Sequence, residues 1–284
     1  MFCLRKIATL LSVLAVIAGC AATQPPQPEP DVFQHDGAGT LTPWTHANFD
    51  NDEKKFTFAI FSDLTGGERE DVFEVAVEQL SLLRPELIVS VGDLIEGGTI
   101  DREQLAREWD SFDQRASRAR APVFRVGGNH DLTNPVMWDV WEERYGNRYY
   151  HFVYKNVLFL VLDTEDNPPD EQWRISDIRD QAIEVVEAEG WGAFNSTVYG
   201  QLTERVSGRI GPEQADYFRK VIEDNPDVDW TFVLMHKPAW LRPDEENFST
   251  VEAALAGRPY TVFYGHVHSY LHEQRLGQDY IRLG

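Results

Sequence analysis

Carboxylates, an amide and several imidazoles follow directly after apolar segments of this chain. They are Asp63, Asp93, Asn129, His130, Asp131, His236, His266 and His268. Carboxylate and amide oxygens combined with imidazole nitrogens suit Mn, Fe or Zn ions better than Ca²⁺ or a thiolate-bound ion. If the loops that carry them meet, there are enough ligands for two ions with one bridging carboxylate. Such a pair of ions can clamp a phosphate and activate water without a protein nucleophile.

The elements that must position these residues alternate between strands and helices. Apolar runs predict strands at 56–61, within 86–93 and 122–131, and in "WTFVLMHKP" and "YTVFYGHVH". Apolar residues at helical spacing predict helices at 71–83, 105–119 and 135–145, and another helix that begins at Pro212. Ligands of open α/β sheets bind beyond the carboxyl ends of the strands, so we expect the loops to meet at one sheet edge.

Length and charge limit the kind of protein. The chain has 284 residues, of which 42% are apolar, which is enough for one large α/β domain or two small ones. Its formal net charge is −21. Such an acidic chain is a poor candidate for binding the phosphate backbone through counterion release. We therefore expect no nucleic acid partner.

The amino terminus has the pattern of a secretory signal. Two basic residues, Arg5 and Lys6, precede an apolar run at 7–18 that is shorter than the roughly 20 residues of a membrane-spanning helix. The sequence "IAGC", which ends at Cys20, resembles the lipobox of bacterial lipoprotein precursors. That resemblance implies cleavage after residue 19 and lipidation of Cys20; the alternative is an ordinary signal peptide with an incidental cysteine.

We therefore expect three regions along the chain. Residues 1–19 form the signal peptide, residues 20–50 the lipidated cysteine and a flexible proline-rich tether, and residues 51–284 the folded domain. The membrane would be a partner through the lipid anchor, in a bacterial cell envelope. Alanines rather than an aspartate follow Cys20, which in Gram-negative lipoproteins suggests the outer membrane, facing periplasm or surface.

One long segment within the domain is irregular and acidic. It covers about 164–209 and contains one expected helix at 178–189. A segment of this length inside a compact domain is usually functional or mobile. We interpret it as an insertion over the site, with a disordered excursion as the alternative.

Five motifs together resemble the calcineurin-like metallophosphoesterase superfamily. They are "SDLTGG", "GDLIEG", "GGNHD", "MHKP" and "GHVH", in this order, and the resemblance runs from about residue 56 to residue 284. It implies an α/β fold, a four-layer αββα sandwich of two mixed sheets flanked by helices.

The resemblance also implies a role for each motif residue. Asp63 and His268 would hold a first metal ion, Asp93 would bridge both ions, and Asn129, His236 and His266 would hold the second. His130 would lie near the scissile phosphate as proton donor or charge stabiliser, and Glu96 would orient it. Asp131 is expected to shape its loop.

The first motif departs from the family pattern. Members of the family commonly have Asp-x-His, whereas this chain has Asp63, Leu64 and Thr65. A neutral threonine hydroxyl is a weak ligand, but it can donate a hydrogen bond to a metal-bound water. We therefore expect the first ion to be bound more loosely or with an extra water, and the second site to be intact.

The resemblance implies hydrolysis of phosphate mono- or diesters of a small substrate by a metal-activated water. The missing histidine supports an alternative, a weakly catalytic or non-catalytic surface lipoprotein that binds metal and recognises a phosphorylated ligand. Retention of His130 and Glu96 favours the enzyme, because a binding site needs no acid for a leaving group. The motifs leave substrate, metal identity and oligomeric state open.

Overall fold

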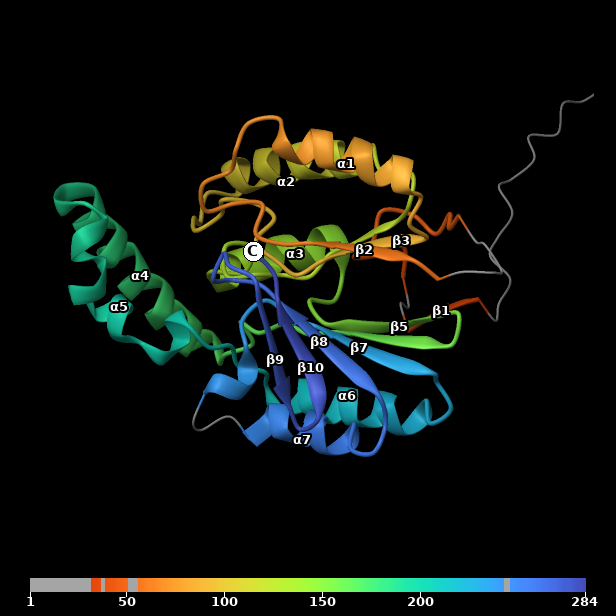
Figure 1. The fold of residues 1–284 in the computed structure, drawn as a ribbon. Coiled ribbons are helices and arrows are strands. Elements are labelled where there is room, and N and C mark those ends of the chain that lie inside the picture. Colours follow the sequence, from red (N-terminus) through yellow and green to blue (C-terminus); the bar gives the residue numbers. More distant parts are fainter. Residues whose placement is uncertain (1–31, 37–38, 51–55, 243–245) are drawn as a thin grey trace, which may run out of the picture.

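A four-layer α/β sandwich is the architecture of the described residues. The computed structural model describes residues 32–36, 39–50, 56–242 and 246–284. Within them, two β-sheets pack face to face between two layers of helices (Figure 1). The predicted fold class is confirmed.

The larger sheet has seven strands in the order β1-β5-β6-β7-β8-β10-β9. These are β1 (Phe33–His35), β5 (Tyr150–Tyr154), β6 (Val157–Val161), β7 (Trp230–Leu234), β8 (Tyr260–Tyr264), β9 (Leu271–Arg275) and β10 (Gln278–Arg282). The sheet is mixed, because β6, β7, β8 and β10 are parallel to one another, whereas β5 and β9 run antiparallel to them and β1 pairs antiparallel with β5. Lys155 and Asn156 both have positive φ and form the turn between β5 and β6.

The smaller sheet positions the first three motifs. It contains β2 (Phe58–Phe61), β3 (Leu87–Ser90) and β4 (Val123–Phe124), in that order. All its pairs are parallel, so only the larger sheet is mixed as predicted. Phe61 pairs with Ser90, which brings the carboxyl ends of β2 and β3 level with each other.

Helices cover the outer face of each sheet (Figure 1). The smaller sheet lies under α1 (Val72–Leu83), α2 (Arg102–Ala116) and α3 (Pro135–Tyr145), and the larger sheet under α6 (Pro212–Asp224) and α7 (Glu246–Ala254). An aromatic core fills the space between the sheets, where Phe152 stacks on Phe124 and Phe159 with ring centroids 4.2 and 4.5 Å apart. Complete burial of such a side chain contributes about 1.5–3 kcal/mol.

The folded domain begins before residue 51, where the sequence predicted its start. Strand β1 pairs antiparallel with β5, and Trp44 is buried against Phe124. The flexible tether is thus contradicted for this stretch, because the stretch buries aromatic surface. The expected signal peptide and Cys20 lie outside the described residues. Among the residues that are described, none of the helices combines the length and apolar character needed to cross a bilayer.

Residues 164–209 form a folded helical excursion that projects from the sandwich (Figure 1). It contains α4 (Pro169–Glu189), the 3-10 helices η1 (Trp191–Ser196) and η2 (Thr203–Arg205), and α5 (Val198–Gln201). A small core of its own includes Ile175, Ala182 and Tyr199. The disordered alternative is therefore wrong, and the predicted helix at 178–189 was too short. Pro169 at the first turn, followed by two acidic residues, is an amino-terminal signal that was missed.

Candidate metal centre

Loops from both sheets converge at the carboxyl ends of their strands. Asp63 follows β2, Asp93 follows β3, Asn129 follows β4, His236 follows β7 and His266 follows β8. Two groups of candidate ligand atoms result. The first group is Asp63 with Asp93 and His268, and the second group is Asp93 with His236 and His266. Within each group the atoms lie within 4.8 Å of one another. Asp93 belongs to both groups, so one carboxylate stands between two candidate cation sites.

The second group is built around His236. Its Nε2 lies 3.1 Å from Asp93 Oδ2 and 3.1 Å from Asn129 Oδ1. Its Nδ1 donates to the carbonyl of Val91 at 2.9 Å. Because Nδ1 is occupied by the main chain, Nε2 is the nitrogen left for a cation. The structure thus brings together Asp93, Asn129 and His236, which the sequence placed around one ion.

His266 completes the second group in the opposite ring orientation. Its Nε2 donates to the main-chain carbonyl of Arg205, 2.6 Å away, which leaves Nδ1 free. Its backbone N–H donates to Asp63 Oδ1 at 2.9 Å. The rings of His236 and His266 meet edge to face with centroids 5.2 Å apart. One residue therefore contributes its side chain to the second group and its backbone to the first.

Charges in the second group balance each other. Burial alone would raise the pKa of Asp93, but the His236 ring and the His130 N–H hold it far below its usual range. Burial alone would lower the pKa of His236, but Asp93 raises it to about 9. Burial, then the positive charges of Lys237 and His236, lower the pKa of His266 well below 6.5. Since a histidine ligand must be deprotonated, His236 would have to lose its extra proton in order to hold a cation here.

The first group is more open. His268 Nε2 lies 3.3 Å from Asp63 Oδ1, and the His268 side chain is 47% exposed whereas that of Asp63 is 2% exposed. The hydroxyl of Ser62 also donates to Asp63. Asp63 is therefore fixed by neighbours, while the imidazole of this group faces solvent.

Thr65 is bound to the main chain of the loop after β3. Its hydroxyl donates to the carbonyl of Ile95 at 2.9 Å, and its backbone N–H donates to the carbonyl of Asp93 at 3.2 Å. The side chain is buried. A hydroxyl has one hydrogen to donate, and the Ile95 carbonyl accepts it here. Thr65 ties the loop after β2 to the loop after β3.

His130 is held both at its backbone and at its ring. Its backbone N–H donates to Asp93 Oδ1 at 2.9 Å, and its ring Nδ1 lies 2.8 Å from the carbonyl oxygen of Glu96. The carboxylate of Glu96 is exposed and accepts instead from the N–H of Gly66 at 3.3 Å. The orienting contact expected of the Glu96 side chain thus comes from its backbone.

Asp131 shapes the loop that carries Asn129 and His130. Its carboxylate is fully buried and accepts hydrogen bonds from the N–H groups of Leu94, Ile95 and Gly128, at 2.8, 3.1 and 2.8 Å. These bonds fasten the third motif to the second, and no atom of Asp131 belongs to either ligand group.

Backbone strain is concentrated at the candidate ligands. Nine residues other than glycine have positive φ in the described part of the chain. Four of them are candidate ligands: Asp63 (φ 50°), Asp93 (58°), His266 (79°) and His268 (49°). Left-handed geometry costs such residues about 1–3 kcal/mol each, and it persists where the surroundings enforce it, commonly at functional sites.

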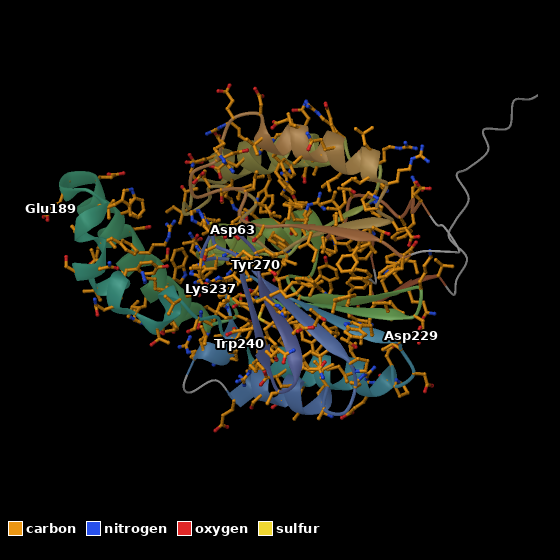
Figure 2. All side chains as sticks on the ribbon, in the orientation of Figure 1. Asp63, Glu189, Asp229, Lys237, Trp240 and Tyr270 are labelled. Carbon is orange, nitrogen blue, oxygen red and sulfur yellow. The ribbon has the colours of Figure 1, made fainter. Side chains whose placement is uncertain are left out.

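Two contributors were missed by the sequence reasoning. The carbonyl of Arg205 in η2 contacts His266, and Lys237 is buried beside His236, with Nζ 2.9 Å from Glu165 Oε1. A lysine that follows directly after a buried strand and a ligand histidine was an available signal, whereas a main-chain carbonyl has none. Figure 2 shows Asp63 and Lys237 on the side of the sandwich next to the excursion.

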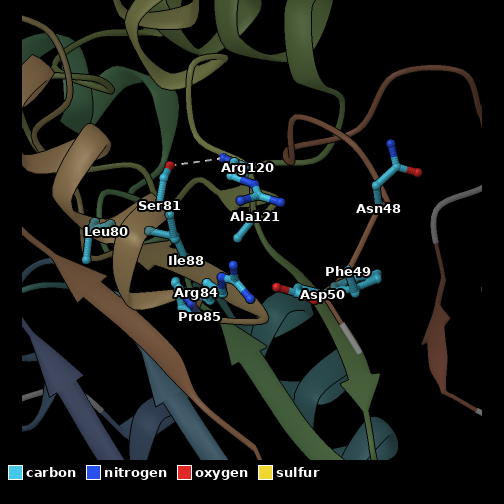
Figure 3. A pocket seen from close by; sticks show the side chains of 10 residues that line it. All are labelled: Asn48, Phe49, Asp50, Leu80, Ser81, Arg84, Pro85, Ile88, Arg120 and Ala121. Atoms are coloured by element: carbon cyan, nitrogen blue, oxygen red, sulfur yellow. Dashed lines mark hydrogen bonds between the residues drawn. The ribbon is translucent and has the colours of Figure 1, made fainter. Parts of the chain in front are cut away.

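The cavity in Figure 3 is separate from this centre. Its lining includes Ser81, Arg84, Pro85, Ile88 and Arg120. Pro85 and Ile88 lie at the amino end of β3, opposite the end from which Asp93 follows. The cavity therefore lies at the opposite end of β3 from the candidate ligands.

Comparison with known proteins gives one family. The model of the calcineurin-like phosphoesterases matches residues 56–270. The fold is similar to that of a dimetal phosphatase from Danio rerio, with a TM-score of 0.54 and 17% identity over 80% of this chain and 86% of that chain. For purple acid phosphatase PPD1 from yellow lupin the TM-score is 0.48, with 15% identity over 81% of this chain and 44% of that one. No curated protein matches the chain significantly.

Proposed function

Because the chain belongs to the calcineurin-like phosphoesterase family, we propose that it hydrolyses phosphate mono- or diesters with two bound metal ions of the Mn, Fe or Zn type. The observation that carries the proposal is the Asp93 carboxylate shared by two groups of ligand atoms. Bound ions would supply a water that ionises near neutral pH and positive charge that stabilises the reacting phosphate.

The chain's own residues fix the geometry of this reaction. Asp93 uses one oxygen for the His130 N–H and the other toward His236. The contact with the Glu96 carbonyl orients the ring of His130 and leaves Nε2 to exchange a proton with the leaving oxygen of the ester. His130 thus belongs to the same rigid loop as the candidate ligand Asn129.

The site of action in the proposal is the cell envelope, with a small phosphorylated substrate and a lipid anchor at Cys20. The motif "IAGC" supports this part. Expression in a Gram-negative host tests it by mass spectrometry of the amino-terminal peptide. We expect a lipidated Cys20 in the membrane fraction and release of the protein by Cys20→Ser; a soluble wild type would contradict the anchor.

A second candidate function is binding of a phosphorylated ligand without turnover. The observation that favours it is the first ligand group, in which the threonine hydroxyl is engaged by Ile95 and the single imidazole, His268, is half exposed. An incomplete first group can retain phosphate affinity while it fails to activate water.

Hydrolysis assays separate the two functions. The substrates are p-nitrophenyl phosphate and bis(p-nitrophenyl) phosphate with added Mn²⁺, and the variants are Asp93→Asn and His130→Ala. His272→Ala is the matched control, because His272 is exposed and pairs with Asp279 away from the ligands. We expect turnover by wild type and control, and its loss in both site variants. Metal and inorganic phosphate binding without turnover by the wild type would establish the binding protein instead.

A further inference from the structure

The two ends of the helical excursion meet at one buried lysine. Lys237 Nζ lies 2.9 Å from Glu165 Oε1, near the start of the excursion, and 2.9 Å from the carbonyl oxygen of Glu204, near its end. Only 2% of Lys237 is exposed. Its backbone N–H donates to the hydroxyl of Thr164 at 3.0 Å, which adds a third contact with the base of the excursion.

Lys237 connects the excursion to two histidines of the candidate metal centre, His236 and His266. It follows directly after His236, and the Glu204 that it binds precedes Arg205, whose carbonyl accepts from His266 Nε2 at 2.6 Å. Arg242 also holds Glu204, through its carboxylate at 2.9 Å. The position of η2, and with it the carbonyl that contacts His266, is therefore set by contacts that converge on Glu204.

We propose that Lys237 is a positioning residue, which clasps both ends of the excursion so that the Arg205 carbonyl holds His266 with Nδ1 toward the second cation. The proposal rests on the metal-binding part of the proposed function. It makes the excursion part of the metal centre, with one carbonyl acting on one ligand.

Physical arguments favour this role over a purely stabilising one. A buried lysine–carboxylate pair is weak evidence for stability, because desolvation of both charges offsets much of their attraction. The partner of the second nitrogen of a ligand histidine, by contrast, fixes the tautomer and ring orientation, and its loss typically costs about 10–100-fold in metal affinity or activity. The Arg205 carbonyl is such a partner for His266, and the contacts of Lys237 set its position. Lys237 itself belongs to neither ligand group.

The test compares Lys237→Met with Lys155→Met. Lys155 Nζ also pairs with a buried glutamate, Glu86 Oε1 at 2.7 Å, but Lys155 lies in the turn at the opposite ends of β5 and β6 from the centre. Both variants remove a cation from a buried carboxylate, so a loss of stability is common to them. The measurements are calorimetric titration with Mn²⁺, and ¹⁵N chemical shifts of the His266 ring in metal-free protein.

We expect Lys237→Met to weaken the tighter metal-binding step about 10–100-fold and to convert His266 from the Nε2–H tautomer to a mixture. Lys155→Met should change neither. Unchanged affinity and tautomer in a folded Lys237→Met protein would overturn the proposal, and so would equal losses in both variants.

Two further measurements keep the test decisive. If Lys237→Met does not fold, Glu165→Gln removes the charge of the partner at constant shape, and we expect the same shift of tautomer to a smaller degree. An unchanged tautomer in that variant would overturn the proposal. If the wild type binds no metal, the proposed function fails, while the ¹⁵N shifts still decide whether Lys237 sets the tautomer of His266.

Discussion

The two ligand groups share Asp93 but differ in their surroundings. In the second group, the His236 side chain is fully buried, and carbonyls of Val91 and Arg205 hold the non-ligating nitrogens of both imidazoles. In the first group, the His268 side chain is 47% exposed, and its Nε2 lies 3.3 Å from Asp63 Oδ1. One candidate cation site is thus held in place by buried contacts, whereas the other is more open.

This difference indicates a division of labour. A buried site whose ligands are already oriented gains affinity, because little conformational entropy is lost on binding. An exposed site with fewer imidazoles leaves coordination positions for water and for a phosphate oxygen. We therefore expect the second group to retain its ion and the first group to face the substrate.

The largest effect is expected for Asp93→Asn, because this carboxylate belongs to both groups. Loss of a partner outside the ligand set already costs about 10–100-fold, so loss of the shared ligand should lower kcat/KM by more than about 100-fold. Metal analysis should show that both ions are lost. Asp139→Asn, at an exposed position in α3, is the control. Retention of one tightly bound ion by Asp93→Asn would show that the groups are independent.

Unequal affinity is the next expected effect. Titration of metal-free protein with Mn²⁺ should give two steps, the tighter at least about 10-fold stronger, which corresponds to about 1.4 kcal/mol. His236→Ala should abolish the tight step and His268→Ala the weak one. Two steps of equal strength, or loss of the tight step in His268→Ala, would contradict the comparison.

A pair of glycines tests whether the second group depends on close packing. A Cβ on Gly92 (φ +100°) would lie 2.6 Å from His236 Nδ1, whereas a Cβ on Gly67 (φ +120°) would meet no atom within 4 Å. Alanine at either position costs about 1–3 kcal/mol for its backbone conformation. Only Gly92→Ala should also weaken the tight metal step, measured by titration beside urea unfolding. Equal affinities in the two variants would exclude the packing argument.

The sequence predicted the residues that converge because their strands are buried. Strand β3, for example, has the sequence LIVS and is buried throughout, so the carboxylate of Asp93 shortly after it stands out. Strand β9 was missed for the opposite reason. It lies at the edge of the sheet, and its residues, LHEQR, are mostly exposed and polar.

Contacts made by the main chain could not be predicted. The carbonyls of Arg205 and Glu96 orient His266 and His130, but any residue type provides a carbonyl. The hydrogen bond between Thr65 and Ile95 could not be predicted for a related reason. Its hydroxyl can donate either to a water or to a carbonyl, and only the path of the loop after β3 shows that Ile95 is within reach.

The smallest effect on metal binding is expected for Thr65→Val. The substitution keeps the shape of the side chain but leaves the Ile95 carbonyl without its donor, which should cost about 1–3 kcal/mol in the free energy of unfolding. Thr65→Ser, which retains the hydroxyl, should restore most of that loss. Because the hydroxyl contacts no ligand atom, both metal-binding steps should stay as in the wild type. A weaker first step with unchanged stability would instead place the hydroxyl on a metal-bound water and make the first group more ordered than its exposure indicates.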